Sequence, residues 1–304
     1  MTKPLALVAL VVVAAVWGGT FVVVKDVTQQ VPPMDFLAVR FLLAAGLLAL
    51  WRPHRLLTLS RKQWGYGALS GLLLSIAYIA QTFGQQHTSA SMSGFITGMS
   101  VVFTPVMAGL LLRQRLGTAT WVAVIVATAG LGIMTIRGFA IGPGEGLTLL
   151  CALFFALHIV ALSKWSTADR AYALTVVQLG VVGVVCLILG APSGIDLPGD
   201  RSFWIPVIGL AVVATAGAYL VQTWAQARLP AVAAALALTM EPVFASFFGV
   251  LFDNDELTIR IVLGAILVVG AMALTEFRAV APSANPLAVE PDAASDAAER
   301  RDRV

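Results

Sequence analysis

The chain has 304 residues, of which 59% are hydrophobic and 12% carry a charge, and its formal net charge is +3. A soluble domain carries about 25% charged residues, so this composition, with a mean hydropathy of +0.90, indicates an integral membrane protein. The basic residues are scattered over short breaks between apolar runs, which excludes the clustered basic face of a nucleic-acid-binding domain.

A membrane-spanning helix needs about 20 mostly apolar residues. Ten stretches meet this need, and we predict an all-α membrane protein with transmembrane helices at roughly 5–24, 35–51, 64–84, 91–112, 118–137, 146–163, 171–190, 203–225, 230–252 and 257–277. The first stretch resembles a signal peptide, but its apolar run is long enough to span and further spans follow, so we expect it to be retained.

The segment 279–304 has a different character, because it is rich in Ala, Pro, Asp, Glu and Arg and has no apolar period. Such a segment cannot bury enough apolar surface to offset its ordering entropy, so we predict a disordered tail. With the N-terminus inside, the inner loops hold eleven Lys and Arg residues and the outer loops hold four. This asymmetry predicts that both termini, and hence the tail, are cytoplasmic.

Two stretches 141 residues apart repeat each other. Residues 75–90, SIAYIAQTFGQQHTSA, and residues 216–231, AGAYLVQTWAQARLPA, match without a gap at six of sixteen positions. The repeat predicts a first five-helix unit at 1–137 and a second at 138–278. Because five is odd, the two units must insert with opposite orientation, as in many secondary transporters, whose sites lie near the midplane between the halves.

The repeated polar residues form one stripe on each helix, because their spacing is i, i+3, i+4, i+7. The stripes consist of Tyr78, Gln81, Thr82 and Gln85, and of Tyr219, Gln222, Thr223 and Gln226. Exposed amides are unfavourable in lipid, so both stripes should face the protein interior or a hydrated cavity. The alternative is interhelical hydrogen bonding alone, which contributes about 0.6 kcal/mol per bond on average.

Three segments carry a resemblance to a known family: AVWGGTFVVVK at 15–25, TPVMAGLLLRQRLGTATWVAVIVATAGLGIM at 104–134, and EPVFASFFGVLFDNDELTIRIVLGAILVVGAMAL at 241–274. Over 5–277 the chain resembles the drug/metabolite transporter superfamily, EamA type. The resemblance implies ten helices in two repeats, and its nearest members are bacterial inner-membrane exporters of amino acids, especially aromatic ones. One departure is that Glu256 precedes Leu-Thr in the second half, whereas Arg115 precedes Leu116 in the first.

Glu241 lies about 11 residues into the ninth predicted helix, about 16 Å along it and close to the middle of a roughly 30 Å hydrocarbon core. An ionised carboxylate there costs at least about 2.5 kcal/mol, so it must be protonated, paired or hydrated. Pro242 should bend this helix, and Pro105, in a similar motif, should bend the fourth. Glu241 then either hydrogen-bonds the opened backbone or takes part in coupling to protons as the helix moves.

We expect a central cavity between the halves, lined by Trp17, Tyr78, Gln81, Met99, His158, Tyr219 and Gln222. Two of these have an alternative role: His158 as a packing residue and Trp17 as a packing partner of a neighbouring helix's glycines. Aromatic rings suit a site for aromatic or apolar side chains.

Arg40 is the one basic residue placed well inside a predicted span. A pair with Asp35 is poorly phased, so Arg40 is expected to extend toward the outer surface. The small-residue pairs Gly67/Gly71 and Gly94/Gly98 should permit close helix contacts.

The sequence shows no phosphate-binding loop, nucleophile elbow or His/Cys/Asp cluster with metal spacing, so we expect no catalytic residue, cofactor or metal. The prediction is a monomeric secondary transporter that contacts lipid, a small-molecule substrate and protons as a coupling ion, and no nucleic acid. The alternatives are a multidrug or other metabolite exporter of the same fold, a channel or scaffold, or a membrane enzyme, for which His158 and Ser100 are the pair on offer.

Overall fold

The computed structural model describes residues 3–28, 30–87, 90–114, 116–135, 142–252 and 258–280. These residues form helices and turns, with no strand among them. The predicted repeat boundary at 137/138 and residues 281–304 of the predicted tail lie outside this part of the chain.

The structure is built from helices with the following bounds: α1 Lys3–Thr28, α2 Pro33–Trp51, α3 His54–Leu57, α4 Arg61–Gln85, α5 Ala90–Gly98, α6 Ser100–Leu112, α7 Thr118–Thr135, α8 Pro143–Trp165, α9 Ala171–Gly190, the 3₁₀ turn η1 Ala191–Ser193, α10 Arg201–Gly209, the π-helix η2 Leu210–Gly217, α11 Ala218–Gln226, α12 Ala231–Leu238, α13 Met240–Phe252 and α14 Ile259–Val280.

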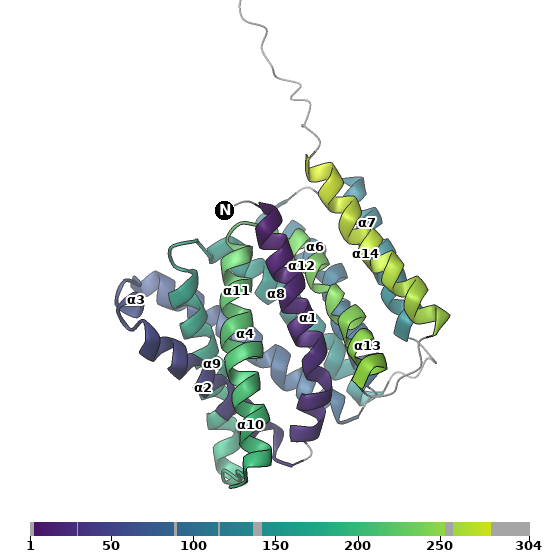
Figure 1. The fold of residues 1–304 in the computed structure, drawn as a ribbon. Coiled ribbons are helices and arrows are strands. Elements are labelled where there is room, and N and C mark those ends of the chain that lie inside the picture. The colour runs from purple at the N-terminus through teal and green to yellow at the C-terminus, as the bar shows by residue number, and fades with distance from the viewer. Residues whose placement is uncertain are drawn as a thin grey trace, which may run out of the picture.

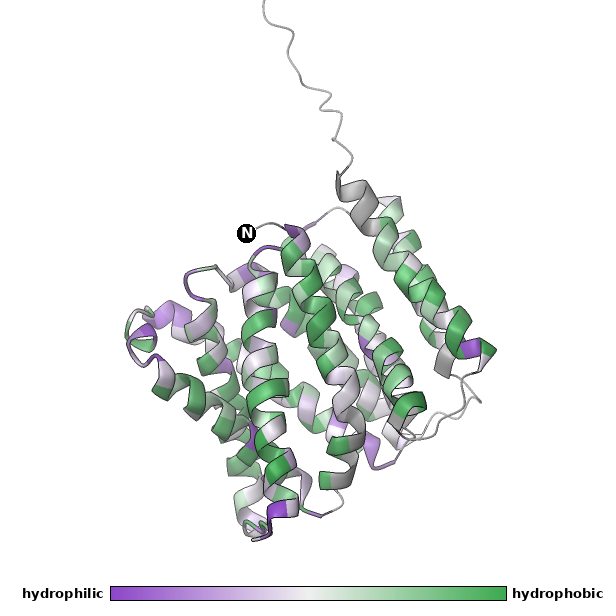
Figure 2. Ribbon diagram, in the orientation of Figure 1, coloured by the Kyte–Doolittle hydropathy of each residue, from purple (hydrophilic) through white to green (hydrophobic). Residues whose placement is uncertain are grey.

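The bundle has the surface of a multi-pass membrane protein. Within the described residues, seven helices are long and apolar enough to cross a membrane, and three shorter apolar helices lie at Ile96–Leu112, Thr118–Ile133 and Ile259–Leu274. Large apolar side chains such as Leu110 and Ile188 are exposed, at 70% and 65% of their surface. Apolar residues cover most of the length of the helices (Figure 2), which is what a surface in contact with lipid requires.

Two predicted spans are interrupted, but not at their prolines. The ninth span breaks at Thr239, between α12 and α13, so Pro242 occupies the first turn of α13, where its missing N–H leaves no helical bond unmade. The fourth span breaks at Met99, between α5 and α6, whereas Pro105 lies inside α6, six residues further on. The breaks therefore lie three residues before Pro242 and six residues before Pro105.

Helix packing in the first half is repeated in the second. α1 packs on α11 and α13, and α8 packs in the corresponding way on α4 and α6, while α2 packs on α9 and α7 on α14. The α7–α14 pair lies along one side of the bundle, and the start of α1 and the end of α14 lie at the same end (Figure 1).

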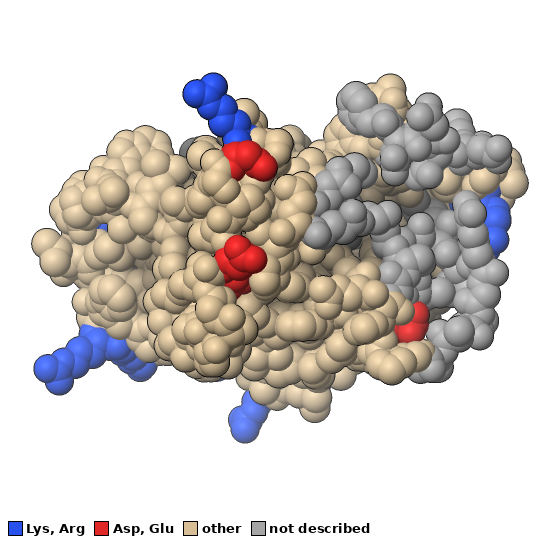
Figure 3. Space-filling model, turned by 90° about the horizontal axis from the view of Figure 1, so that it is seen from below, with Lys and Arg blue, Asp and Glu red and all other residues tan. Residues whose placement is uncertain are grey.

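The opposite end, where α10 begins, carries isolated Lys and Arg side chains at its margin and acidic side chains nearer the middle (Figure 3). Asp200 caps α10 there, because its carboxylate accepts hydrogen bonds from the Ser202 hydroxyl at 2.8 Å and the Phe203 N–H at 3.0 Å. The hydrogen bond from Ser202 contributes most, and that from Phe203 next, to holding the pKa of Asp200 below its ordinary value.

The predicted small-residue contact of α4 is present. A Cβ atom at Gly71 would lie 2.7 Å from the carbonyl oxygen of Gln178 and from the Cβ of Val181, both on α9. Gly98 packs similarly against the Leu131 side chain, whereas Gly94 has no atom within 4 Å of its Cβ position.

Gly71→Ala should therefore lower the thermal stability of the detergent-solubilised protein, because overpacking of this kind costs about 1–3 kcal/mol. Gly65→Ala, on the same helix with no atom within 4 Å of its Cβ position, is the matched control. Apparent melting temperatures from the monodisperse size-exclusion peak after heating would test this. Equal melting temperatures for the two variants would contradict the close α4–α9 contact.

Candidate functional site

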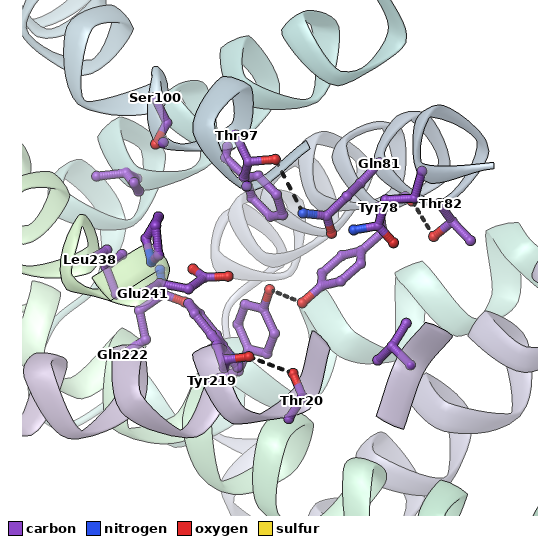
Figure 4. A pocket seen from close by; sticks show the side chains of 18 of the residues that line it. Thr20, Tyr78, Gln81, Thr82, Thr97, Ser100, Tyr219, Gln222, Leu238 and Glu241 are labelled. Atoms are coloured by element: carbon purple, nitrogen blue, oxygen red, sulfur yellow. Dashed lines mark hydrogen bonds between the residues drawn. The ribbon is translucent and has the colours of Figure 1, made fainter. Parts of the chain in front are cut away.

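A cavity lies at the centre of the bundle, where α1, α2, α4, α8 and α11 meet the breaks of the fourth and ninth spans (Figure 4). Its lining consists of Trp17, Thr20, Val24, Phe36, Leu37, Arg40, Tyr78, Gln81, Thr82, Gln85, Gly94, Thr97, Gly98, Ser100, Phe155, Ile159, Tyr219, Gln222, Leu238, Thr239, Glu241 and Pro242. Five of the seven predicted cavity residues are in this lining: Trp17, Tyr78, Gln81, Tyr219 and Gln222.

Much of the lining comes in pairs that are 141 residues apart, the offset of the sequence repeat. The pairs are Tyr78/Tyr219, Gln81/Gln222, Thr97/Leu238, Gly98/Thr239 and Ser100/Glu241. Both halves of the chain therefore supply the wall from the same positions, including the two helix breaks. The 141-residue offset thus places Ser100 opposite Glu241. Aligning Thr104-Pro105 with Glu241-Pro242 on their prolines would instead place Thr104 there, one helical turn away.

The first pair is in direct contact. The Tyr219 hydroxyl donates to the Tyr78 hydroxyl at 2.7 Å. Trp17 packs against Tyr219 with ring centroids 5.1 Å apart, and Phe155 packs edge-on against Tyr78 at 5.5 Å. Aromatic groups contributed by α1, α4, α8 and α11 thus form one continuous wall.

The π-helix η2 anchors two lining residues of other helices. The indole N–H of Trp17 donates to the carbonyl of Ala214 at 2.8 Å, and Nε of Arg40 donates to the hydroxyl of Thr215 at 2.7 Å. Segments of π-helix within α-helices are frequent at functional sites, because they redirect backbone and side chains. Here η2 fixes an aromatic and a cationic side chain at the cavity.

Arg40 does not extend to the membrane surface. Its side chain is 3% exposed, and its guanidinium carbon lies 5.7 Å from the centre of the Tyr78 ring. It forms no ion pair with Asp35, whose Oδ2 accepts the Asp196 N–H at 3.0 Å instead. Sequence reasoning missed Arg40 as a cavity residue, although the cost of a cation in the middle of a span was the available signal.

Glu241 lies in the first turn of α13, and Figure 4 shows its carboxyl group directed toward the middle of the cavity. Within the described residues its side chain forms no hydrogen bond and no ion pair, so it does not cap the opened backbone. The Thr239 hydroxyl does this instead by donating to the carbonyl of Leu236 at 2.6 Å. The carboxyl group is therefore available to a ligand or a proton.

Gln222 also has an unused acceptor. Its side chain is 2% exposed, and its Oε1 has no hydrogen-bond partner. Its counterpart Gln81 donates a long hydrogen bond, at 3.4 Å, to the Thr97 hydroxyl. Gln222 and Glu241 lie on the same side of the cavity in Figure 4.

His158 and Met99 are outside the lining. His158 is behind Tyr219, where its Nε2–H bonds Gln178 Oε1 at 2.7 Å, and Gln178 in turn donates to the Thr223 hydroxyl at 2.9 Å. This chain of buried bonds supports the back of the Tyr219 ring, so His158 packs rather than faces the cavity. Met99 is the half-buried residue at the break between α5 and α6.

The two polar stripes differ at their last residues, because Gln85 lines the cavity and its counterpart Gln226 does not. Gln85 reaches the cavity, whereas the Gln226 side chain turns toward α8 and donates to the carbonyl of Ile159 at 3.0 Å. No group of three His, Cys, Asp or Glu residues within the described ranges is arranged to hold a metal ion.

Relatives of the chain are described as transporters. The chain is 29% identical over 276 residues to a protein of Archaeoglobus fulgidus described as an uncharacterized transporter, with 88% of this chain and 85% of that protein covered. It is 23% identical over 279 residues to the uncharacterized transporter YoaV of Bacillus subtilis, with 86% and 93% covered.

A solved structure described only as the crystal structure of a protein has the same fold, with a TM-score of 0.76 at 16% identity over 91% of this chain and 98% of that one. The model of the EamA-like transporter family matches residues 4–136 and again residues 142–277. With an all-helical membrane fold, a central cavity and two family matches that together cover most of its length, the chain belongs to the EamA-like transporter family.

Proposed function

We propose that the protein is a secondary transporter that exports small metabolites, above all amino acids with aromatic or apolar side chains, across the bacterial inner membrane by alternating access. The observation that carries this proposal is the paired lining of the cavity. Five pairs of residues separated by 141 positions meet around one space, as expected for a site between two repeats.

The proposed architecture is ten transmembrane helices in two inverted repeats, at 1–137 and 138–278, with a cytoplasmic tail at 279–304. The Tyr78–Tyr219 bond supports a twofold relation between the repeats, because equivalent residues meet their own counterparts at a twofold axis. The odd number of five helices in each repeat is what makes the proposed relation an inversion. The two separate family matches, and the recurrence of the packing of α1 around α8, support the division.

The proposed movement uses the helix breaks. Backbone that is already interrupted at Met99 and Thr239 bends at less cost than a continuous helix, so these points, with Pro105 and Pro242 nearby, are the proposed hinges. Glu241 lies directly beside the second break and is the proposed site of coupling to protons. Gly18 brings α1 close to this region, because its Cβ position lies 2.7 Å from the Glu241 carbonyl oxygen.

The cavity wall supports the proposed substrate class. Rings of Trp17, Tyr78, Phe155 and Tyr219 offer large apolar surfaces, while Gln81, Gln222 and Thr97 offer hydrogen bonds to a polar end. Counterflow of a panel of labelled amino acids into proteoliposomes containing the purified protein tests the proposal. Uptake of aromatic amino acids above protein-free vesicles is expected, and uptake of aromatic drug cations alone would favour a multidrug exporter instead.

The topology can be tested with single cysteines in a background where Cys151 and Cys186 are replaced by serine. A membrane-impermeant maleimide added to intact cells should label Ser193→Cys, on the predicted outer side, and spare Thr58→Cys, on the inner side. Both positions are exposed, so accessibility within the protein is matched. Tags on both termini should be cytoplasmic. Labelling of both cysteines from outside would contradict the predicted orientation.

Alanine at Tyr78 or Tyr219 should lower transport roughly two- to tenfold without lowering expression, because each ring contact contributes about 0.5–1.5 kcal/mol. Tyr66→Ala is the control, since Tyr66, near the start of α4, stacks on Trp165 at the end of α8, outside the cavity lining. Initial rates of counterflow, normalised to protein in the vesicles, would measure the effect. Equal rates for all three variants would remove the tyrosine pair from the site.

Glu241→Gln should abolish substrate accumulation driven by a pH gradient but keep counterflow at saturating substrate. The reason is that an amide still accepts hydrogen bonds but cannot take up and release a proton as a carboxyl group does. Substrate accumulation with and without an imposed pH gradient would be compared in the same vesicles. Unchanged pH-driven accumulation in Glu241→Gln would show that the carboxyl group has no coupling role.

A further inference from the structure

The cavity lining contains one basic and one acidic side chain that do not form an ion pair with each other. Arg40 and Glu241 are the charged residues of the lining, and no ion pair joins them. Arg40 uses one donor, Nε, on Thr215, and its other donors form no hydrogen bond within the described residues. Two unpaired charges in the hydrocarbon region are costly, so this arrangement requires a ligand or water to complete it.

The unused groups also have complementary hydrogen-bonding character. On one side are the guanidinium donors of Arg40, whose planar shape suits a carboxylate. On the other are two acceptors: the Glu241 carboxyl group in its ionised form, and Oε1 of Gln222, which is buried without a partner. An ammonium group has three donors and no acceptor, so it matches this second side.

From this arrangement we infer that Arg40 binds the carboxylate, and Glu241 with Gln222 binds the ammonium group, of a free α-amino acid in its zwitterionic form. The inference deepens the proposed function and rests on it, because it assigns the two ends of the proposed substrate to named residues. The substrate side chain then lies against the aromatic wall that includes Tyr78 and Tyr219.

The lining favours a zwitterion over a simple anion or cation, because it offers both unpaired donors and unpaired acceptors. An anionic substrate would pair with Arg40 but leave the Gln222 acceptor buried and unused. A cationic substrate would do the reverse and leave the Arg40 guanidinium, 3% exposed, without a counter-charge. A buried polar group that a ligand leaves unpaired penalises that ligand strongly.

The test uses competition against labelled L-phenylalanine on the purified full-length protein in nanodiscs. Phenethylamine lacks the carboxylate and 3-phenylpropionate lacks the ammonium group, while both keep the ring. Each should compete at least roughly tenfold less well than unlabelled L-phenylalanine in the unmodified protein. This first arm needs no variant, so it does not depend on the folding of any substituted chain.

The second arm removes each proposed ligand-binding group in turn by substitution and measures which compounds bind more weakly. Glu241→Gln should weaken L-phenylalanine about tenfold while leaving 3-phenylpropionate unchanged, and Arg40→Gln should weaken L-phenylalanine while leaving phenethylamine unchanged. Asp169→Asn and Arg61→Gln are the controls, because both residues are exposed and lie outside the cavity lining. Should Arg40→Gln not fold, Glu241→Gln and the first arm decide the question.

The outcomes separate this inference from the proposed function. If amino acids bind but either analogue competes as well as L-phenylalanine, the zwitterion assignment is wrong and amino-acid transport stands. The same conclusion follows if Glu241→Gln weakens all three compounds equally. If no amino acid binds or undergoes counterflow, both proposals fall.

Discussion

A polar group inside the hydrocarbon layer needs a partner in the protein or in water, and this constraint determines where the chain can be irregular. The breaks at Met99 and Thr239 would be prohibitively costly against lipid, so they face the interior. There they meet the polar faces of α4 and α11 and the side chains that η2 anchors. The cavity is thus the place where the interrupted backbone, the amides and the charges are sheltered together.

The two halves share a scaffold but not its chemistry. Tyrosine and glutamine recur at the same positions of α4 and α11 and give the cavity matching walls. The charges have no such copies: Ser100 stands opposite Glu241, and the residue 141 positions after Arg40 is Val181. Because the acid and the base each occur once, the charge distribution of the cavity does not follow the sequence repeat.

The sequence predicted the polar faces of α4 and α11 because helical spacing and the internal repeat both point to the same residues. It did not predict which neighbour each residue meets. Gln226 belongs to the same stripe as Gln222, yet its amide reaches the Ile159 carbonyl on α8, and His158 is directed to Gln178 rather than to the cavity. Periodicity defines a face of a helix, whereas the partner depends on how helices from both halves come together.

The positions of the breaks and of Arg40 were beyond sequence reasoning for related reasons. Pro242 lies near a break, but a proline is accommodated in a first helical turn, so the interruption falls before it. Arg40 is stabilised by Thr215 of a π-helix, and nothing in the local sequence of η2 distinguishes it from an ordinary apolar helix. Both features arise from contacts between distant segments.

The pairing of α7 with α14 has a consequence for the surrounding bilayer. The two helices pack along each other, and large apolar side chains on both, such as Ile125 and Ile266, are 65% and 60% exposed, so the pair presents much of its surface to lipid. Acyl chains therefore lie directly against α14, which packs in turn on α13, the helix that begins at the second break. Lipid contacts on this flank thus bear on the position of that break.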